Sequence, residues 1–382
     1  FPCVHEDAMP LQASQVHRSQ VQGLSFAPDG RKLVSLATSD AFVALWETRV
    51  LVVPAEAEGV PSHQDELLRN SCTFASFSRG FELFAAVVAD VKVSVWQQTS
   101  DGALERKDTF EVRGDSINSC EISSNKVLCT TSREHKVRLY DLKAESPMEV
   151  ECIEAHDDQV YNCCFSPDGA VLATCGADKL VNLWRLTDSL AVSKVGFAAG
   201  HRKSVLSVAI SDDSNLLCTA SEDKTLRVWD LTGIRQADLS DPLALPTTCR
   251  LRGHEDAVVC CAFSPATQRS EGGVKVCSGS WDGSLIMWDV QSAVMLLKLR
   301  HSEALLGCSF SCCGNFISSI CLDNSLRLWN VSDVEQVQCV QEAKGSTKDS
   351  KLIIGSAFAA GRLVYALASN KSNIGKPVVW TF

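Results

Sequence analysis

Residues 200–231 read GHRKSVLSVAISDDSNLLCTASEDKTLRVWDL, and this stretch decides the fold. Residues 205–210 alternate apolar side chains with small or polar ones, residues 216–220 are apolar, and residues 226–229 alternate again. Two polar, turn-forming segments separate the three runs. Short alternating runs divided by tight turns are typical of antiparallel β-strands. The stretch therefore predicts three consecutive strands of one sheet.

The same pattern recurs along the chain. An aromatic residue ends the third strand of each unit, and in seven units an acidic residue stands six positions before it. The pairs are Asp40 and Trp46, Asp90 and Trp96, Glu134 and Tyr140, Asp178 and Trp184, Asp223 and Trp229, Asp282 and Trp288, and Asp323 and Trp329. Trp380 closes an eighth unit, with Ile374 at that offset. Successive aromatics lie 41 to 59 residues apart, which is close to the period of four-stranded propeller blades.

Five units also open with a histidine: His17, His156, His201, His254 and His301. An opening Gly-His and a closing Trp-Asp resemble the WD-repeat family of β-propellers, and the resemblance covers nearly the whole chain. It implies an all-β fold: a single closed β-propeller of four-stranded antiparallel blades over residues 1–382. Aromatic-closed units predict eight blades, with seven plus a degenerate blade as the alternative. The last unit lacks an outer strand, and we expect the segment around Met9 to Gln12 to complete it, which removes exposed sheet edges.

The resemblance also implies a structural network inside each blade. It links the opening His, the turn Asp, a Ser or Thr two residues before that Asp, and the closing Trp, and so satisfies buried polar groups. The complete sets are His17, Thr38, Asp40 and Trp46; His201, Ser221, Asp223 and Trp229; and His254, Ser280, Asp282 and Trp288. Gly176 and Cys321 occupy the Ser position in units four and seven, so we expect shorter networks there.

Composition narrows the function classes. Hydrophobic residues make up 45% and charged residues 21% of 382, and no run approaches eighteen consecutive apolar residues, so we expect no membrane insertion. The net charge of −10 disfavours nucleic acid as a partner. Most of the 18 cysteines fall at apolar strand positions and none has zinc-site spacing, which predicts reduced thiols, no metal and no cofactor. We therefore expect an intracellular location, cytoplasmic or alternatively nuclear.

Nothing in the sequence indicates an enzyme. His, Ser and Asp recur in every complete unit, whereas a catalytic triad is needed once. The chain has no Gly-x-Ser-x-Gly elbow, phosphate-binding Gly-rich loop or His-Glu-x-x-His motif. We expect a non-enzymatic protein without a small-molecule substrate.

A binding surface is the stronger prediction. The resemblance implies that partners dock on the top face, around the central channel, through residues beside the inner strand and before the turn Asp. Four of these are apolar: Val259, Trp281, Leu306 and Leu322. Four further candidates on this face, which is mainly polar in the preceding units, are Leu206, Glu222, Arg133 and Tyr161. The hypothesis is that the apolar four form an exposed patch that anchors a protein or peptide. The alternative is that Trp281 packs against a neighbouring blade.

We therefore expect a protein–protein interaction scaffold, as one domain of a larger protein. One alternative is a substrate receptor of a cullin-type ubiquitin ligase, for which residues 46–49 and 140–143 each depart from the Trp-Asp-x-Arg/Lys pattern at one position. Another is the autoinhibitory sensor propeller of a larger receptor. Three inserts, at 53–66, 233–248 and 267–275, are expected to be solvated loops.

Overall fold

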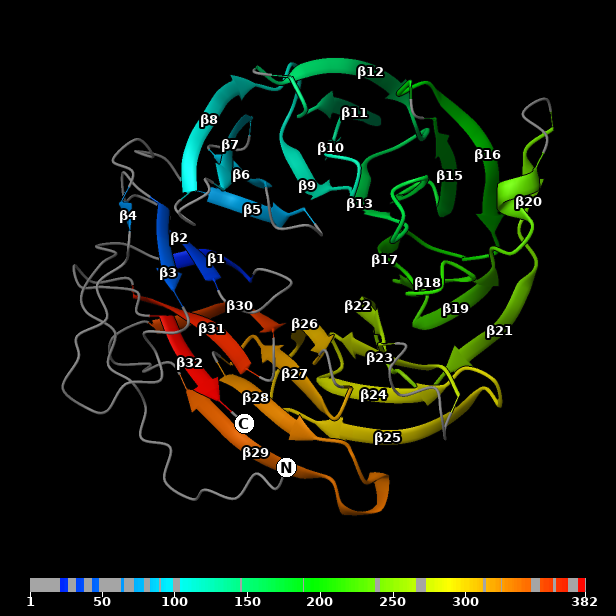
Figure 1. Cartoon of the computed structure of the whole chain (residues 1–382). Helices are drawn as coiled ribbons and strands as arrows, with labels where there is room; N and C mark the ends of the chain where they lie inside the picture. Colours follow the sequence, from blue (N-terminus) through cyan, green and yellow to red (C-terminus); the bar gives the residue numbers. More distant parts are fainter. Residues whose placement is uncertain are drawn as a thin grey trace.

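The structure is a computed structural model, shown in Figure 1. It describes residues 21–26, 32–37, 43–47, 63–64, 72–78, 83–88, 91–98, 104–144, 146–187, 189–237, 241–265, 273–311, 314–323, 325–344, 351–359, 362–369 and 377–381. The described strands form eight sheets, or blades, arranged around a common centre (Figure 1).

The first four blades take their strands in chain order. Blade one contains β1 (Val21–Phe26), β2 (Lys32–Ala37), β3 (Val43–Glu47) and β4 (His63–Gln64), and blade two contains β5 (Cys72–Phe77), β6 (Leu83–Val88), β7 (Lys92–Gln98) and β8 (Leu104–Glu111). Blade three contains β9 (Ile117–Ile122), β10 (Val127–Ser132), β11 (Lys136–Asp141) and β12 (Met148–Glu154). Blade four contains β13 (Val160–Phe165), β14 (Val171–Gly176), β15 (Leu180–Leu186) and β16 (Val192–Ala199), to which β20 (Leu243–Ala244) is added.

The remaining blades follow the same plan. Blade five contains β17 (Val205–Ile210), β18 (Leu216–Ser221), β19 (Thr225–Asp230) and β21 (Thr247–Arg252), and blade six contains β22 (Val258–Phe263), β23 (Lys275–Ser280), β24 (Ser284–Asp289) and β25 (Val294–Arg300). Blade seven contains β26 (Leu305–Phe310), β27 (Phe316–Cys321), β28 (Ser325–Asn330) and β29 (Gln338–Lys344). Blade eight contains β30 (Lys351–Ala359), β31 (Arg362–Ser369) and β32 (Pro377–Thr381).

The first strand of each blade lies nearest the centre. Each of these inner strands contacts the next one along the chain, and β30 contacts β1, so they follow one another around a ring (Figure 1). This arrangement confirms the all-β propeller and its eight repeating units. The segment around Met9 to Gln12, expected to complete blade eight, lies outside the described residues.

The core lies between neighbouring blades. One buried cluster joins Val181 and Leu183 of blade four to Val205, Leu217 and Trp229 of blade five. Such an arrangement fits the sequence pattern, because strands that are covered on both faces are nearly continuous runs of apolar or small residues, as in β14 and β18, and so give each blade two buried sides. A blade is therefore stabilised mainly by the blades beside it, as in other repeat folds.

The inner strands share an irregularity that aims side chains out of the sheet. In β17, Val205 is opposite Ser221 and Ser207 is opposite Ala220, which leaves Leu206 as an unpaired bulge residue. The same bulge falls on the second residue of β1, β5, β9, β13, β22 and β26. Because a bulge redirects the side chain of the extra residue, the second residue of the inner strand differs in orientation from its neighbours in each of those blades.

The insert at 233–248 corrects one expectation. Its described part, residues 233–237 and 241–248, is not a solvated loop: Ile234 is buried in the 3-10 helix η2 (Ile234–Gln236), and β20 pairs in parallel with β16. The Leu245 N–H donates to the Phe197 carbonyl at 2.8 Å, and Arg185 Nη2 donates to the Ile234 carbonyl at 2.7 Å. Ile234 and Leu245 of the insert pack with Val195 and Ala198 of β16, and so cover the outer edge of blade four. Of the insert at 53–66, only β4 is described, and residues 267–272 of the third insert lie outside the description.

The thiols behave as small core side chains. None of the fourteen cysteines whose side chains are described forms a disulfide, and burial raises the pKa of the Cys164 and Cys175 thiols well above its ordinary value. Cys260 and Cys308 approach each other with their Sγ atoms 3.3 Å apart, from the inner strands of blades six and seven. Within the described part of the chain, no helix is long and apolar enough to cross a bilayer, and no group of three His, Cys, Asp or Glu side chains is placed to hold a metal ion.

Candidate protein-interaction face

The turns that carry the candidate face are fixed by a buried polar chain. In blade five, His201 Nδ1 lies 3.0 Å from Asp223 Oδ2, and His201 Nε2 lies 2.7 Å from Thr219 Oγ1. The Trp229 indole N–H donates to the same Thr219 oxygen at 3.0 Å. The chain thus runs from the turn carboxylate to the indole, and Thr219 links the two rings.

The linking residue differs from the sequence prediction, which assigned that place to Ser221. Ser221 Oγ donates to the carbonyls of Lys203 and Ser204, at 3.2 and 2.8 Å, and accepts the Asp223 N–H at 3.1 Å. The reason is the distance from each hydroxyl to the Trp229 indole. Trp229 is opposite Leu217 in the strand register, so Thr219 is its diagonal neighbour two residues along and can accept the indole N–H, whereas Ser221 lies four residues along.

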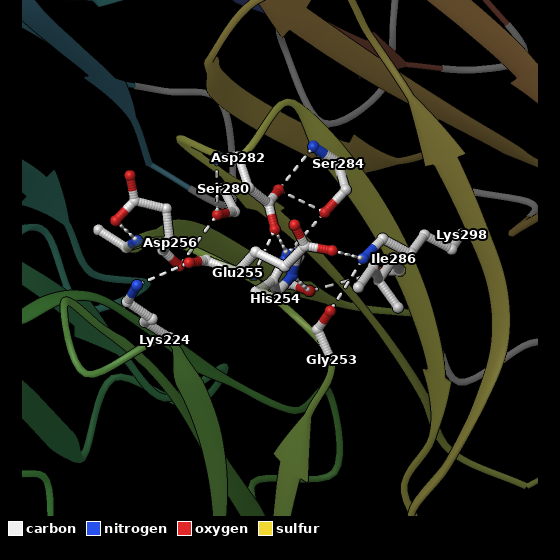
Figure 2. Close-up of polar contacts among 12 residues, drawn as sticks. Lys224, Gly253, His254, Glu255, Asp256, Ser280, Asp282, Ser284, Ile286 and Lys298 are labelled. Carbon is white, nitrogen blue, oxygen red and sulfur yellow. Dashed lines mark hydrogen bonds and ion pairs between the residues drawn. The ribbon is translucent and has the colours of Figure 1, made fainter.

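Blade six repeats this geometry, and Figure 2 shows its His254 with Asp282 and Ser284. His254 Nε2 lies 2.8 Å from Ser278 Oγ, which also accepts the Trp288 indole N–H at 2.9 Å. His254 Nδ1 lies 2.8 Å from Ser284 Oγ and 3.4 Å from Asp282 Oδ2. Ser280, the predicted link, instead donates to the Asp256 carbonyl at 3.1 Å.

Blade four has a complete network, contrary to the prediction from Gly176. His156 lies 2.8 Å from Asp178 and 2.9 Å from Thr174, which accepts the Trp184 N–H at 3.1 Å. Gly176 is irrelevant to the chain because the linking hydroxyl comes two residues earlier.

Blade seven has a shorter network, as expected, but for a different reason. His301 and Trp329 both reach Ser319, at 2.8 and 2.9 Å. Asp323 binds the Ser302 hydroxyl instead of the imidazole, and the buried His301 Nδ1 has no hydrogen-bond partner. In blade one, Trp46 lies in β3 opposite Leu33, and His17, Thr38 and Asp40 fall outside the described residues.

A sequence signal for the linking residue exists. The position four before the turn acid is Thr130, Thr174, Thr219, Ser278 or Ser319 in blades three to seven. The position two before it carries Ser, Gly, Ser, Ser and Cys in the same blades. All five blades carry a hydroxyl only at the first of these positions, which is the one that bridges His and Trp in blades four to seven.

Hydrogen bonding keeps the turn carboxylates charged. Burial alone would raise the pKa of Asp223, but hydrogen bonds from His201, Thr225 and the Arg202 N–H outweigh it and lower the pKa well below its ordinary value. The pKa of Asp282 is lowered in the same way, by His254 and Ser284 against the effect of burial. These charged, multiply bonded groups hold the turn in one conformation.

The residue just before each turn acid is therefore held at a fixed place. The Trp281 N–H donates to the Ala257 carbonyl at 2.9 Å, and the Leu322 N–H donates to the Ala304 carbonyl at 2.8 Å. In blade five the Glu222 N–H makes the equivalent bond to the Ser204 carbonyl, at 3.0 Å. Each of these residues lies beside the bulge residue of its own blade, because Val258 is opposite Ser280, Leu305 opposite Cys321 and Val205 opposite Ser221.

The four apolar members of the face come from two adjacent blades; we call Val259, Trp281, Leu306 and Leu322 the apolar sector. Trp281, Leu306 and Leu322 are 50%, 44% and 52% exposed, and Val259 is partly buried. The inner strands β22 and β26 are in contact, and a Cβ on Gly279, at the end of β23, would lie 3.3 Å from Leu305 Cβ. About half of the Trp281 surface is thus exposed to solvent.

The other four predicted residues belong to blades three to five. Arg133 is exposed, and Tyr161, Leu206 and Glu222 are partly buried. Burial raises the pKa of Tyr161, and the charges of Glu222 and Asp158 raise it further, which indicates that Tyr161 and Glu222 are neighbours across blades four and five. Apart from Leu206 this part of the face is polar or charged, so the exposed large apolar side chains of the predicted face lie in blades six and seven among the residues whose side chains are described.

Comparison with known proteins agrees with this geometry. The family model described as WD domain, G-beta repeat matches residues 9–47, 148–185, 193–230, 246–289 and 294–330, just over half of the chain. Nuclear distribution protein PAC1 of Gibberella zeae is 27% identical over 314 residues, which cover 75% of this chain and 64% of that protein. WD repeat and SOCS box-containing protein 1 of Mus musculus is 42% identical over 60 residues, which cover 16% of this chain and 14% of that protein.

Solved structures show the same fold. The crystal structure of Chaetomium thermophilum Sqt1 bound to the N-terminus of the ribosomal protein L10 has a TM-score of 0.74 at 15% identity, covering 98% of both chains. The computationally designed Ika8 protein has a TM-score of 0.73 at 17% identity, covering 97% of this chain and 99% of its own. The recurring motifs, the propeller and the matching family model together show that the chain belongs to the WD-repeat family.

Proposed function

We propose that this propeller is a non-enzymatic scaffold that binds a protein or peptide through the apolar sector of its top face. The observation that carries the proposal is the equivalent placement of half-exposed Trp281 and Leu322 in adjacent blades, each held by a backbone hydrogen bond. Large apolar side chains on a rigid frame bind a partner without a large ordering cost. Trp is also enriched among the residues that contribute most to interfaces.

The comparisons support the type of function. WD-repeat propellers are in general protein-interaction scaffolds rather than enzymes, and Sqt1, whose fold is similar, is bound to a segment of a ribosomal protein. We propose a protein or peptide partner for this chain as well, and action in a reducing compartment such as the cytoplasm, which fits the cysteines with described side chains, none of which forms a disulfide. The ligase-receptor and sensor alternatives remain predictions; co-purification of a cullin adaptor would test the first.

The test is affinity purification from cells with two matched double variants. Trp281→Ala/Leu322→Ser removes the anchors, and Met148→Ser/Val294→Ser removes side chains of similar exposure from the outer strands β12 and β25. With both variants folded by circular dichroism, partners are expected to be lost from the first and kept by the second. Retention of every partner by the first variant would reject the top-face assignment.

A further inference from the structure

A second set of equivalent positions borders the apolar sector. In blades three to seven, an exposed charged side chain stands two residues before the inner strand: Asp115, Asp158, Lys203, Asp256 and Glu303. Each adjoins the residue whose carbonyl accepts the N–H of the position before the turn acid. Asp256 is thereby placed beside Trp281, and Glu303 beside Leu322, since the accepting carbonyls belong to Ala257 and Ala304.

The two carboxylates beside the apolar sector have no cation partner among the described residues. Asp256 Oδ1 accepts the N–H of Ala257 at 2.9 Å, which orients the carboxylate without neutralising it. The adjacent Glu255 differs, because its carboxylate lies 3.3 Å from Arg300 and 3.8 Å from Lys298.

The nearby lysines are committed elsewhere. Lys224 donates to the Glu255 carbonyl at 2.7 Å, and Lys298 donates to the Gly253 carbonyl at 2.9 Å, as Figure 2 shows. Lys224 and Lys298 keep their charge, but these bonds direct their ammonium groups to backbone carbonyls rather than to Asp256 or Glu303, so both carboxylates remain open to a partner. An acidic border of this kind attracts a cationic ligand and repels phosphate groups of nucleic acids and anionic lipids.

We infer that the partner segment is a basic peptide of another protein, in which one apolar anchor side chain is flanked by Lys or Arg. This inference rests on the proposed function and specifies its ligand. The anchor lies on the apolar sector, and the flanking cations lie against Asp256 and Glu303. Two adjacent blades offer the same acid-plus-apolar pair, so a segment that crosses from blade six to blade seven meets two such pairs.

The charges contribute mainly to association. Exposed ion pairs contribute about 0.2–1 kcal/mol each, so neutralising both carboxylates is expected to weaken binding roughly two- to thirtyfold at low salt, through a slower association rate. The difference is expected to shrink as salt is raised from about 0.05 M to 0.5 M, because screening shortens the range of surface charges. Loss of the anchors acts differently, through faster dissociation at every salt concentration.

The experiment is selection of a random twelve-residue phage-displayed peptide library on the intact chain, followed by kinetics of the selected peptides. The inference predicts enriched peptides with an aromatic or aliphatic residue within three positions of Lys or Arg. Asp256→Asn/Glu303→Gln is expected to slow their association at low salt. Asp115→Asn, at the equivalent position of blade three, is the matched control and should leave it unchanged.

The outcomes separate the two levels of the proposal. Peptides that lose binding to Trp281→Ala/Leu322→Ser but bind the charge variant as they bind the unaltered chain would overturn this inference and leave the proposed function standing. Peptides that are acidic or uncharged would do the same. Selected peptides that bind all variants equally would overturn both. Should the double anchor variant fail to fold, Leu322→Ser alone is used, because its side chain lies on an exposed turn.

Discussion

Replacing Thr219 with Val tests the reading of the buried network. The substitution keeps the shape of the side chain and removes one hydroxyl, which is fully buried and lies 2.7 Å from His201 Nε2 and 3.0 Å from Trp229 Nε1. The indole N–H and the imidazole nitrogen would then both be buried without a partner. Each such group costs about 1–3 kcal/mol, so we expect the free energy of unfolding to fall by about 3 kcal/mol.

Ser221→Ala is the matched control in the same strand. Ser221 bonds two loop carbonyls and the Asp223 N–H but neither ring, so its loss is expected to cost about 1 kcal/mol. Urea unfolding followed by fluorescence gives both values. A double-mutant cycle with Trp229→Phe isolates the contact, because only Thr219 shares a hydrogen bond with the indole.

The cycle has a clear prediction. Thr219→Val and Trp229→Phe should couple by about 1–2 kcal/mol, and Ser221→Ala and Trp229→Phe by less than about 0.5 kcal/mol. If Thr219→Val and Ser221→Ala lower the free energy of unfolding equally and couple equally to Trp229→Phe, the assignment of Thr219 as the linking residue is refuted.

Three further predictions follow from individual residues. Burial and the charge of Arg327 lower the pKa of His301 to about 4, so the unfolded chain binds a proton at this histidine before the folded chain does as the pH falls below about 6.5. The free energy of unfolding should therefore drop by roughly 2–3 kcal/mol between pH 6.5 and 4. In urea titrations at several pH values, His301→Gln should remove most of this pH dependence. Gly196→Ala places a Cβ 2.6 Å from Ile234 Cδ1 and 2.8 Å from the Leu243 carbonyl oxygen. The added methyl group should detach the insert at 233–248 from blade four, at a cost of about 1–3 kcal/mol. Faster amide hydrogen exchange of residues 243–245 would show this, and unchanged exchange would contradict the predicted clash. The exposed Cys152 and Cys339 should react with iodoacetamide well before the buried cysteines, by mass spectrometry of the folded chain, and uniform labelling would disagree with this account.

Much of the fold follows from the sequence alone. The fixed offset between turn acid and aromatic, and the period between aromatics, predict the number and order of the sheets, because each blade repeats one hydrogen-bonding scheme. The position of the top-face residues follows from the same spacing. Trp281 and Leu322 precede their turn acids directly, and the structure places both at exposed turns with the same backbone bond.

Two features could not be predicted from the sequence pattern. Alternation puts Thr219 and Ser221 on the same face of β18, so the period of two does not show which of them bonds the indole. The strand register decides it, because it places only Thr219 within reach of the Trp229 indole. The insert at 233–248 looked like a solvated loop because of its prolines and polar residues. Ile234 and Leu245 are the signal that was missed, since they bury against the outer strand of blade four.

The most direct test of the central claim is site-specific photocrosslinking in cells. A photoreactive phenylalanine analogue replaces Leu322 on the apolar sector in one variant and Val294 on the outer strand β25 in another, where the two native side chains are about equally exposed. The account predicts a discrete crosslinked partner from position 322 and none from position 294, with the crosslink mapped beside Lys or Arg in the partner. Crosslinks from position 294 alone would contradict the assignment of the top face.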